Sequence, residues 1–119
     1  KVGHQGTFNA NPVSAAAGIA ALSLIGDSGV CERANDFAGQ LRRRMNEVLA
    51  GLSVPWAVYG DYSGFHLFAN SDNRAIDPLK FDASAIDPDE LIRADPKLLS
   101  NLRLAMALGG VDLTPRFSG

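Results

Sequence analysis

The sequence predicts a small α+β domain with helices packed on a small, mostly antiparallel sheet. Apolar residues recur at helical spacing in three segments, and two short segments between them are rich in β-branched and aromatic residues. The length, 119 residues, is enough for one hydrophobic core. Helices and a hairpin that each carry one apolar side bury those sides against each other, which gives the α+β arrangement.

The first predicted helix runs from Pro12 to Ile25 and stops at Gly26. Asn11 is the expected N-cap, and Pro12 occupies the first helical position, where its missing N–H costs nothing. The surface of this segment is almost entirely small or apolar. A helix that is apolar on all sides is typical of a buried position, so we expect it to be buried in a contact surface larger than this chain provides.

The second predicted helix follows Asp27, with Ser28 as its N-cap, and ends at Gly51. Its predicted buried side is a stripe of residues at helical spacing: Val30, Ala34, Phe37, Leu41, Met45, Val48 and Leu52. The triplet 42–44 is all arginine and suggests phosphate or nucleic acid. A solvated face is favoured instead, because three acidic residues share the helix: Glu32, Asp36 and Glu47.

Residues 54–59 and 65–70 are predicted to form an antiparallel hairpin around a turn at 60–64. Pro55 near the start of the first strand suggests a sheet edge. Alternation in the second strand places Phe65, Leu67 and Ala69 on one face and His66 and Phe68 on the other. His66 is expected to be a half-buried structural residue.

Residues 71–96 form a predicted acidic loop with three prolines and one short helical turn near 89–93. A loop of this length is typically functional or mobile. Its aspartates lack the calcium-loop spacing, so no metal site is predicted.

The last predicted helix begins at Pro96, with Asp95 as N-cap, and ends at Gly109 and Gly110. Residues 111–113 are then expected to form a short strand that joins the hairpin. The predicted apolar side of this helix is Leu98, Leu99, Leu102, Ala105, Met106 and Leu108.

Composition excludes several classes of protein. The net charge of −2 gives no general reason to expect nucleic acid or an anionic membrane as a partner. The apolar run 15–25 is too short to span a bilayer. The single cysteine, Cys31, rules out an internal disulfide and fits a reducing cytoplasm, and we expect it to be a packed thiol.

The segment from Gly6 to Pro12 reads Gly-Thr-Phe-Asn-Ala-Asn-Pro and leads directly into the first helix. A hydroxyl, flexible backbone and a helix start together suit an anion such as phosphate. An ordinary capped helix start has the same pattern, so the residues alone leave both interpretations open.

Residues 4–18, HQGTFNANPVSAAAG, resemble a signature of the class III (ornithine-type) aminotransferases that bind pyridoxal 5′-phosphate, nearest the glutamate-1-semialdehyde aminomutase branch. The resemblance implies that Gly6 and Thr7 bind the cofactor, with Thr7 contacting the phosphate held by the neighbouring subunit of a homodimer. It also implies a small amino-acid or amine substrate and amino-group transfer.

The resemblance further implies how the chain is divided. Residues 1–26 would end the large cofactor-binding domain, and residues 27–119 would form a truncated C-terminal small domain of a fold-type I enzyme. The chain starts at Lys1 without a methionine and stops at Gly119 after a strand-like segment, so we expect a fragment of a longer protein.

The lysines limit the chemistry expected of this chain. Lys1, Lys80 and Lys97 are its lysines, and the last two are expected to be solvated. In the family, the lysine that forms the Schiff base lies upstream of the Gly-Thr pair. The resemblance therefore implies no catalytic residue here and no activity of the fragment alone.

Two questions stay open. Aminomutases of the family carry a carboxylate near Phe117-Ser118, and its absence here favours an aminotransferase over an aminomutase. The alternative to an enzyme is a non-enzymatic α+β dimerisation module, in which the first helix serves only for subunit contact.

Overall fold

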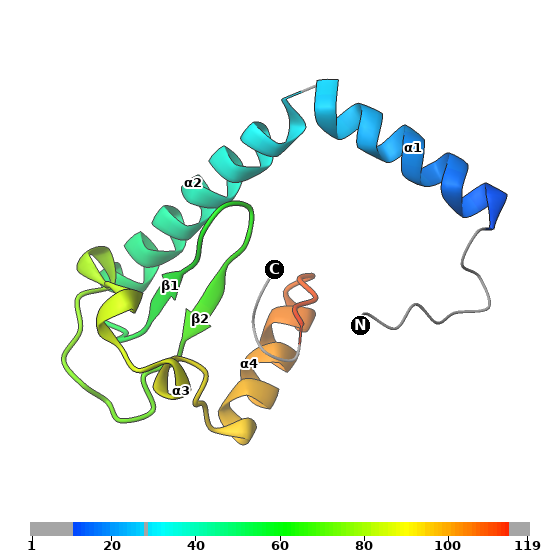
Figure 1. Ribbon diagram of the computed structural model, residues 1–119. Coiled ribbons are helices and arrows are strands. Elements are labelled where there is room, and N and C mark those ends of the chain that lie inside the picture. The colour runs from blue at the N-terminus through cyan, green and yellow to red at the C-terminus, as the bar shows by residue number, and fades with distance from the viewer. Residues whose placement is uncertain (1–10, 28, 115–119) are drawn as a thin grey trace, which may run out of the picture. The chain divides into compact units, whose positions relative to one another are not determined.

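The computed structural model describes residues 11–27 and 29–114 (Figure 1). The chain divides into two compact units, and the division falls between Arg33 and Ala34. Its elements are α1 (Pro12–Asp27), α2 (Val30–Gly51), β1 (Ala57–Tyr59), β2 (His66–Phe68), α3 (Pro88–Leu91), α4 (Pro96–Leu108) and two 3₁₀ turns, η1 (Pro78–Lys80) and η2 (Ala83–Ala85). Helices with a two-stranded antiparallel sheet confirm the predicted α+β class.

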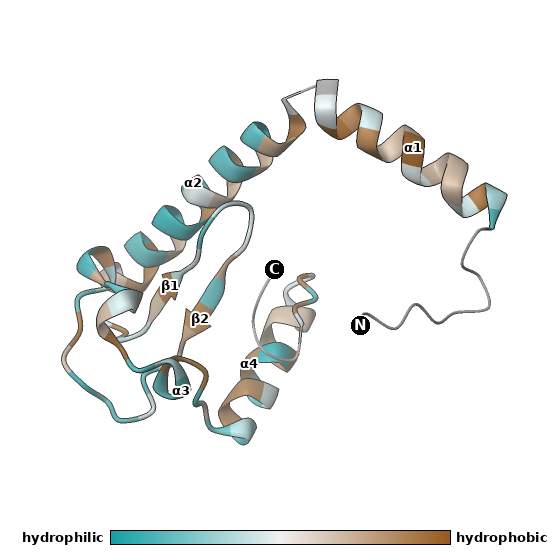
Figure 2. Cartoon of the chain, in the orientation of Figure 1, coloured by the Kyte–Doolittle hydropathy of each residue, from teal (hydrophilic) through white to brown (hydrophobic). Residues whose placement is uncertain are grey.

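Helix α1 begins where the sequence predicts. The Asn11 Oδ1 atom accepts hydrogen bonds from the backbone N–H groups of Val13 and Ser14, at 2.9 and 3.3 Å, which confirms the predicted N-cap. Apolar residues recur along the whole helix (Figure 2). Every side chain from position 12 to 26 is exposed, so the described residues do not supply the larger contact surface in which this helix is expected to be buried.

Helix α2 has the predicted C-terminal end, but its predicted stripe is only partly correct. Ala38 is its buried residue, and Leu41 and Met45 are half-buried, whereas Phe37 is 68% exposed. The side of α2 that faces the hairpin is rotated relative to the predicted stripe, because Arg42 and Asn46 also face the hairpin. Both bind its backbone, and these bonds determine which side of α2 is covered. The predicted N-cap, Ser28, lies outside the described residues.

The hairpin is shorter than predicted, and its register pairs Ala57 with Phe68, Val58 with Leu67 and Tyr59 with His66. The predicted alternation is confirmed, since Phe68 is 1% exposed on the face opposite Leu67. The expectation for His66 is wrong. Its side chain is exposed, and its ring lies 5.5 Å from that of Tyr59, centroid to centroid.

Residues 71–95 cover one face of the hairpin. The ring of Phe81 stacks on Phe68 at 5.1 Å and also contacts Tyr59 at 6.0 Å. Pro78 at the start of η1 is buried. This segment is therefore a structural cover, in which Pro78 is buried and the half-buried Phe81 extends the hydrophobic core.

The aspartates of this segment cap its short helical turns. Asp77, Asp82 and Asp87 each accept a hydrogen bond from the backbone N–H two residues later, with distances from 2.9 to 3.0 Å. Such Asx caps satisfy donors that a single turn leaves unpaired. The predicted helical turn is confirmed as α3, which begins one residue and ends two residues earlier than expected.

Buried Asn70 fixes where this segment leaves β2. It is 4% exposed and has a positive φ of 46°. Its Nδ2 atom donates to the carbonyl oxygens of Pro55 and Arg74, at 2.7 and 2.8 Å, and its Oδ1 atom accepts from the Arg74 N–H. A second anchor is the 2.7 Å ion pair between Arg74 and the mostly buried Glu90 carboxylate.

Helix α4 has the predicted caps. Asp95 accepts from the N–H of Lys97 at 2.9 Å, and Gly110, with a φ of 86°, lies just after the end of the helix. The predicted strand at 111–113 is wrong. The Leu113 carbonyl oxygen accepts instead from the Arg103 Nε atom at 2.9 Å, so this backbone bonds to a side chain of α4.

None of the helices within the described ranges is by itself long and apolar enough to cross a membrane. Helices α1 and α2 meet that length and composition only as a broken pair.

Candidate functional site

The two residues predicted to bind the cofactor phosphate, Gly6 and Thr7, lie outside the described residues. The structure does describe the helix start that follows them. It therefore shows whether the first turn of α1 has backbone N–H groups available to bind an anion.

The first turn of α1 has no free backbone donor. Pro12 has no N–H, Asn11 Oδ1 occupies the N–H groups of Val13 and Ser14, and the Ala15 N–H donates to the Asn11 carbonyl oxygen at 2.9 Å. The N–H groups of Val13, Ser14 and Ala15 are therefore not open to an anion. A phosphate contact in this region would have to come from residues before Asn11.

The described lysines do not form a cofactor site. The Lys80 side chain is 83% exposed, and its Nζ atom lies 3.5 Å from Asp77 Oδ2. Lys97 is exposed on the first turn of α4. Both are solvated as predicted, and neither lines a cavity that would exclude water from a Schiff base. The described residues thus do not fit the aldehyde end of pyridoxal phosphate, and no reaction step is assigned to them.

The titratable groups with shifted pKa values, Asp82 and Tyr59, have structural roles. Hydrogen bonds from the hydroxyl and backbone N–H of Ser84 lower the pKa of the exposed Asp82 carboxyl, and burial raises the pKa of the Tyr59 phenol. Within the described ranges, no three His, Cys, Asp or Glu residues are grouped so that they could hold a metal ion. Cys31 is exposed, so the prediction of a packed thiol is wrong.

Arg42 departs from the prediction of a solvated arginine face. It is half-buried, and its Nη1 atom donates to the carbonyl oxygens of Tyr62 and Gly64, at 3.0 and 2.6 Å. Arg43 and Arg44 are exposed as expected. Arg42 therefore holds the hairpin turn against α2, and the arginine triplet is not one functional patch.

Asn46 is the residue that sequence reasoning missed. Its Nδ2 atom donates to the Val58 carbonyl oxygen at 2.9 Å, and its Oδ1 atom accepts from the Val58 N–H at 2.7 Å. The available signal was its position between Met45 and Leu49, a polar amide next to residues of the inward side.

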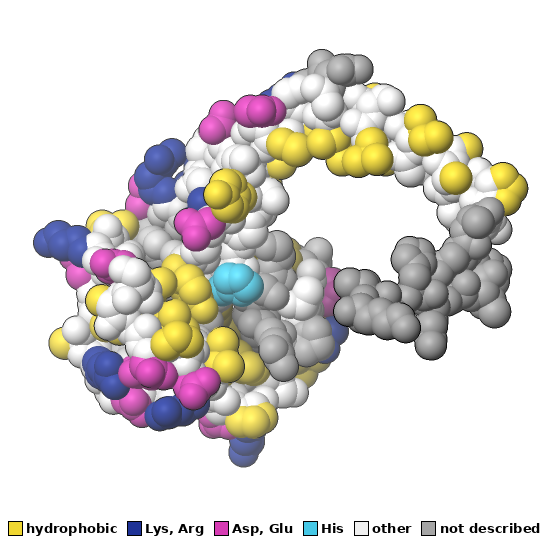
Figure 3. Space-filling view, in the orientation of Figure 1, with side chains coloured by type: hydrophobic (Ala, Val, Ile, Leu, Met, Phe, Trp, Pro, Cys, Tyr) yellow, Lys and Arg dark blue, Asp and Glu magenta, His cyan; other side chains and the backbone are white. Residues whose placement is uncertain are grey.

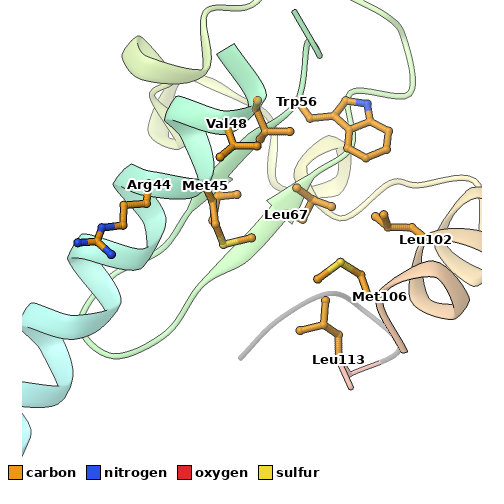
Figure 4. Close-up of a pocket in the computed structure, with 10 residues that line it drawn as sticks. Arg44, Met45, Val48, Trp56, Leu67, Leu102, Met106 and Leu113 are labelled. Atoms are coloured by element: carbon orange, nitrogen blue, oxygen red, sulfur yellow. The ribbon is translucent and has the colours of Figure 1, made fainter. Parts of the chain in front are cut away.

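Among the cavities beside the hairpin, two are lined by Leu67 of β2. The first, about 310 Å³, is almost wholly apolar, with walls from α2, β1, β2 and α4 that include Met45, Trp56, Leu67, Leu102 and Met106 (Figure 4). The Arg44 guanidinium points away from it. The second, about 480 Å³, is lined by Tyr59, His66, Leu67, Leu91, Ile92, Ala94 and Leu99. Neither contains a buried group able to act as a nucleophile or base.

No protein-family model matches this chain. The chain is 38% identical over 63 residues to a glutamate-1-semialdehyde 2,1-aminomutase from Methanothrix thermoacetophila, which covers 53% of this chain and 14% of the relative. It is 32% identical over 84 residues to the protein of the same name from Halobacterium salinarum, covering 71% of this chain and 19% of the relative. The matches thus span less than a fifth of each curated relative.

Proposed function

We propose that this chain is the C-terminal part of a pyridoxal-phosphate enzyme that transfers or shifts an amino group. The observation that carries the proposal is the similarity to two archaeal glutamate-1-semialdehyde 2,1-aminomutases, one of which extends over 71% of the chain. The α+β arrangement of residues 34–114 is compatible with a small domain of such an enzyme. When bound, pyridoxal phosphate supplies an electron sink next to the substrate amine.

In this proposal, residues before α1 hold the cofactor phosphate of a neighbouring subunit. Thr7 donates its hydroxyl hydrogen to a phosphate oxygen, and Gly6 allows the backbone to approach closely. A charge-assisted bond of this kind contributes about 1.5–3 kcal/mol. The satisfied first turn of α1 supports this division, since Asn11 leaves that turn no donor of its own.

The partner in this proposal is a second subunit, and the exposed apolar surface of α1 lies in the contact between them. Hydrophobic side chains are visible along this helix in Figure 3. Exposed fractions of 67% at Ile19 and 68% at Leu22 support the role, because apolar surface gains free energy when a partner removes it from water.

The substrate is a small amino acid or amine. The names of both relatives favour an aminomutase, which moves an amino group between adjacent carbons of one substrate. The lack of a carboxylate at Phe117-Ser118 favours an aminotransferase. An aminomutase consumes one substrate without a second amino acceptor, so omission of the acceptor separates the two activities.

The proposal is tested with the complete protein incubated with pyridoxal phosphate. We expect a cofactor absorbance band that survives gel filtration. Thr7→Ala should weaken cofactor binding about 10- to 100-fold, which corresponds to the loss of one charge-assisted bond. Ser14→Ala, on the exposed first turn of α1, is the matched control and should bind normally.

Two results would contradict parts of the proposal. Unchanged affinity in Thr7→Ala removes the phosphate contact. A complete protein that stays colourless removes the enzyme assignment and favours the non-enzymatic dimerisation module.

A further inference from the structure

The strap, residues 75–89, is a loop whose two ends meet. Arg74, just before the strap, lies 2.7 Å from the carboxylate of Glu90, just after it. The Ser71 hydroxyl donates to the Arg93 carbonyl oxygen at 3.2 Å, so more than one contact joins the two ends. Figure 1 shows the chain leaving the end of β2 and returning there as α3. The residues that flank the strap therefore form a closed neck, at positions 70–74 and 90–93.

The polar contacts of the strap are local. Asp77, Asp82 and Asp87 cap its turns, and its backbone hydrogen bonds reach no further than Leu91. The ion pair of Lys80 with Asp77 is also internal. Within the part of the chain that the structure describes, no hydrogen bond or ion pair joins the strap to the hairpin or to α2. The strap can therefore move as one body without losing a polar contact.

Apolar contacts hold the strap on the hairpin. The Phe81 ring stacks on Phe68 at 5.1 Å and lies 6.0 Å from the ring of Tyr59, and Pro78 is buried. The other residues of the strap are exposed or half-buried. Helix α2, in contrast, binds the hairpin backbone through two polar side chains. Segments with few buried contacts open at a lower free energy than the rest of a domain, so the strap should open before α2.

The strap also forms one wall of a further cavity of about 480 Å³. Residues 81–84 of the strap line this cavity together with Arg42 and Asn46 of α2 and Tyr59 of β1. Its lining is therefore partly charged and polar. If the strap moves away from the hairpin, this cavity widens and the Tyr59 ring loses the cover of Phe81.

We propose that the strap is a lid that opens about its neck while the hairpin and α2 remain folded, with Phe81 as the contact that keeps it closed. The neck stays in place because Asn70, which is 4% exposed, binds both backbone groups of Arg74. The ion pair between Arg74 and Glu90 closes the neck on the other side. Opening widens the polar cavity, so the strap controls access to that side of the domain.

The test is trypsin cleavage of the complete protein under native conditions, with each cleaved bond identified by mass spectrometry. Cleavage after Lys80 measures the population of open strap, and cleavage after Arg74 measures opening of the neck. Each rate is divided by the rate at the same bond in an unstructured peptide. We expect a normalised rate at Lys80 at least about 10-fold above that at Arg74, yet at least about 100-fold below that of the peptide. Low urea concentrations should change the rate at Lys80 little, because a local opening exposes little surface.

Two variants test the contact that closes the lid. Phe81→Ala should raise the normalised rate at Lys80 by about 10-fold or more, because the ring no longer stacks on Phe68. Leu79→Ala is the matched control within the strap. The Leu79 side chain is 58% exposed, so this variant should stay within about twofold of the unmodified protein.

Four results would overturn the proposal. Cleavage after Lys80 that is no faster than cleavage after Arg74 would mean that the strap does not move separately from its neck. A rate at Lys80 that rises with urea as steeply as global unfolding would mean that the strap opens only when the domain unfolds. A rate equal to that of the peptide would mean that the lid is not closed. An unchanged rate in Phe81→Ala would mean that another contact holds the strap.

Discussion

Helix α1 and the hairpin are both apolar, yet one is exposed and the other buried. Ile19 and Leu22 are 67 and 68% exposed, whereas Val58 and Phe68 are 3 and 1% exposed. The hairpin is covered by α2 on one side and by residues 71–95 on the other. An apolar pattern therefore predicts that a surface favours burial. Whether that surface is buried within this chain depends on the elements that pack against it.

Polar anchors account for the difference. Arg42 and Asn46 of α2 bind the hairpin backbone, and Asn70 ties β2 to the segment that covers it. These bonds fix the orientation of apolar surfaces that could otherwise slide. Between Pro12 and Asp27, α1 has no charged residue before its last position, so it has little with which to make such anchors.

The largest expected effect is at Phe68. Phe68→Ala should lower the free energy of unfolding by about 3–5 kcal/mol, because it leaves a cavity against Phe81. Ile19→Ala in α1 is the matched control and should change it by less than about 0.5 kcal/mol. Urea denaturation of the 119-residue chain, at a concentration low enough to keep it monomeric, measures both. Equal effects would abolish the distinction between the two regions.

Asn46 is expected to come next. Asn46→Ala should lower the free energy of unfolding by about 1–3 kcal/mol, because the N–H and C=O of Val58 lose their partners at a part-buried site. Asn101→Ala, at an exposed position of α4, is the control and should stay within about 0.5 kcal/mol. If Asn46→Ala leaves the free energy of unfolding unchanged, water replaces the hydrogen bonds of the side chain, and Asn46 is not a stabilising anchor.

The cap of α1 should have a smaller and local effect. Asn11→Ala should destabilise α1 by about 1 kcal/mol, because two N–H groups lose their acceptor. Circular dichroism should show lost helicity with an unchanged unfolding transition of residues 34–114. Asn11→Ser keeps an acceptor and should restore the helicity. A shift of the main transition would contradict the independence of α1.

The smallest effect is expected at alkaline pH. Burial raises the pKa of Tyr59 above 10.0, so the folded protein holds this proton more tightly than the unfolded chain. Its contribution to stability is complete below pH 10 and is lost as pH rises through the folded-state pKa. Tyr59→Phe should unfold with a weaker alkaline dependence. The same dependence in both proteins would remove Tyr59 as the cause.

Local signals in the sequence were sufficient for the helices and the hairpin. Asn11, Asp95 and Gly109 mark helix ends through bonds to nearby residues, and strand alternation depends only on backbone geometry. These features need no knowledge of distant contacts, which is why they could be predicted.

Features that depend on distant contacts could not be predicted. Arg42 and Asn46 bind residues 12 to 22 positions away, and Phe81 reaches back to β2. Residues 111–113 have strand-like composition but bond to Arg103. At the candidate site, sequence resemblance singles out Gly6 and Thr7, and their role stays a prediction.

The measurement that tests the central claim most directly is the association state of the 119-residue chain by sedimentation equilibrium. If α1 is a subunit contact, the chain should dimerise as its concentration rises. Ala20→Glu in α1 should shift it to monomer, and Ala107→Glu, at an exposed position of α4, should not. A chain that stays monomeric at high concentration, or a dimer that Ala20→Glu leaves intact, would contradict the account.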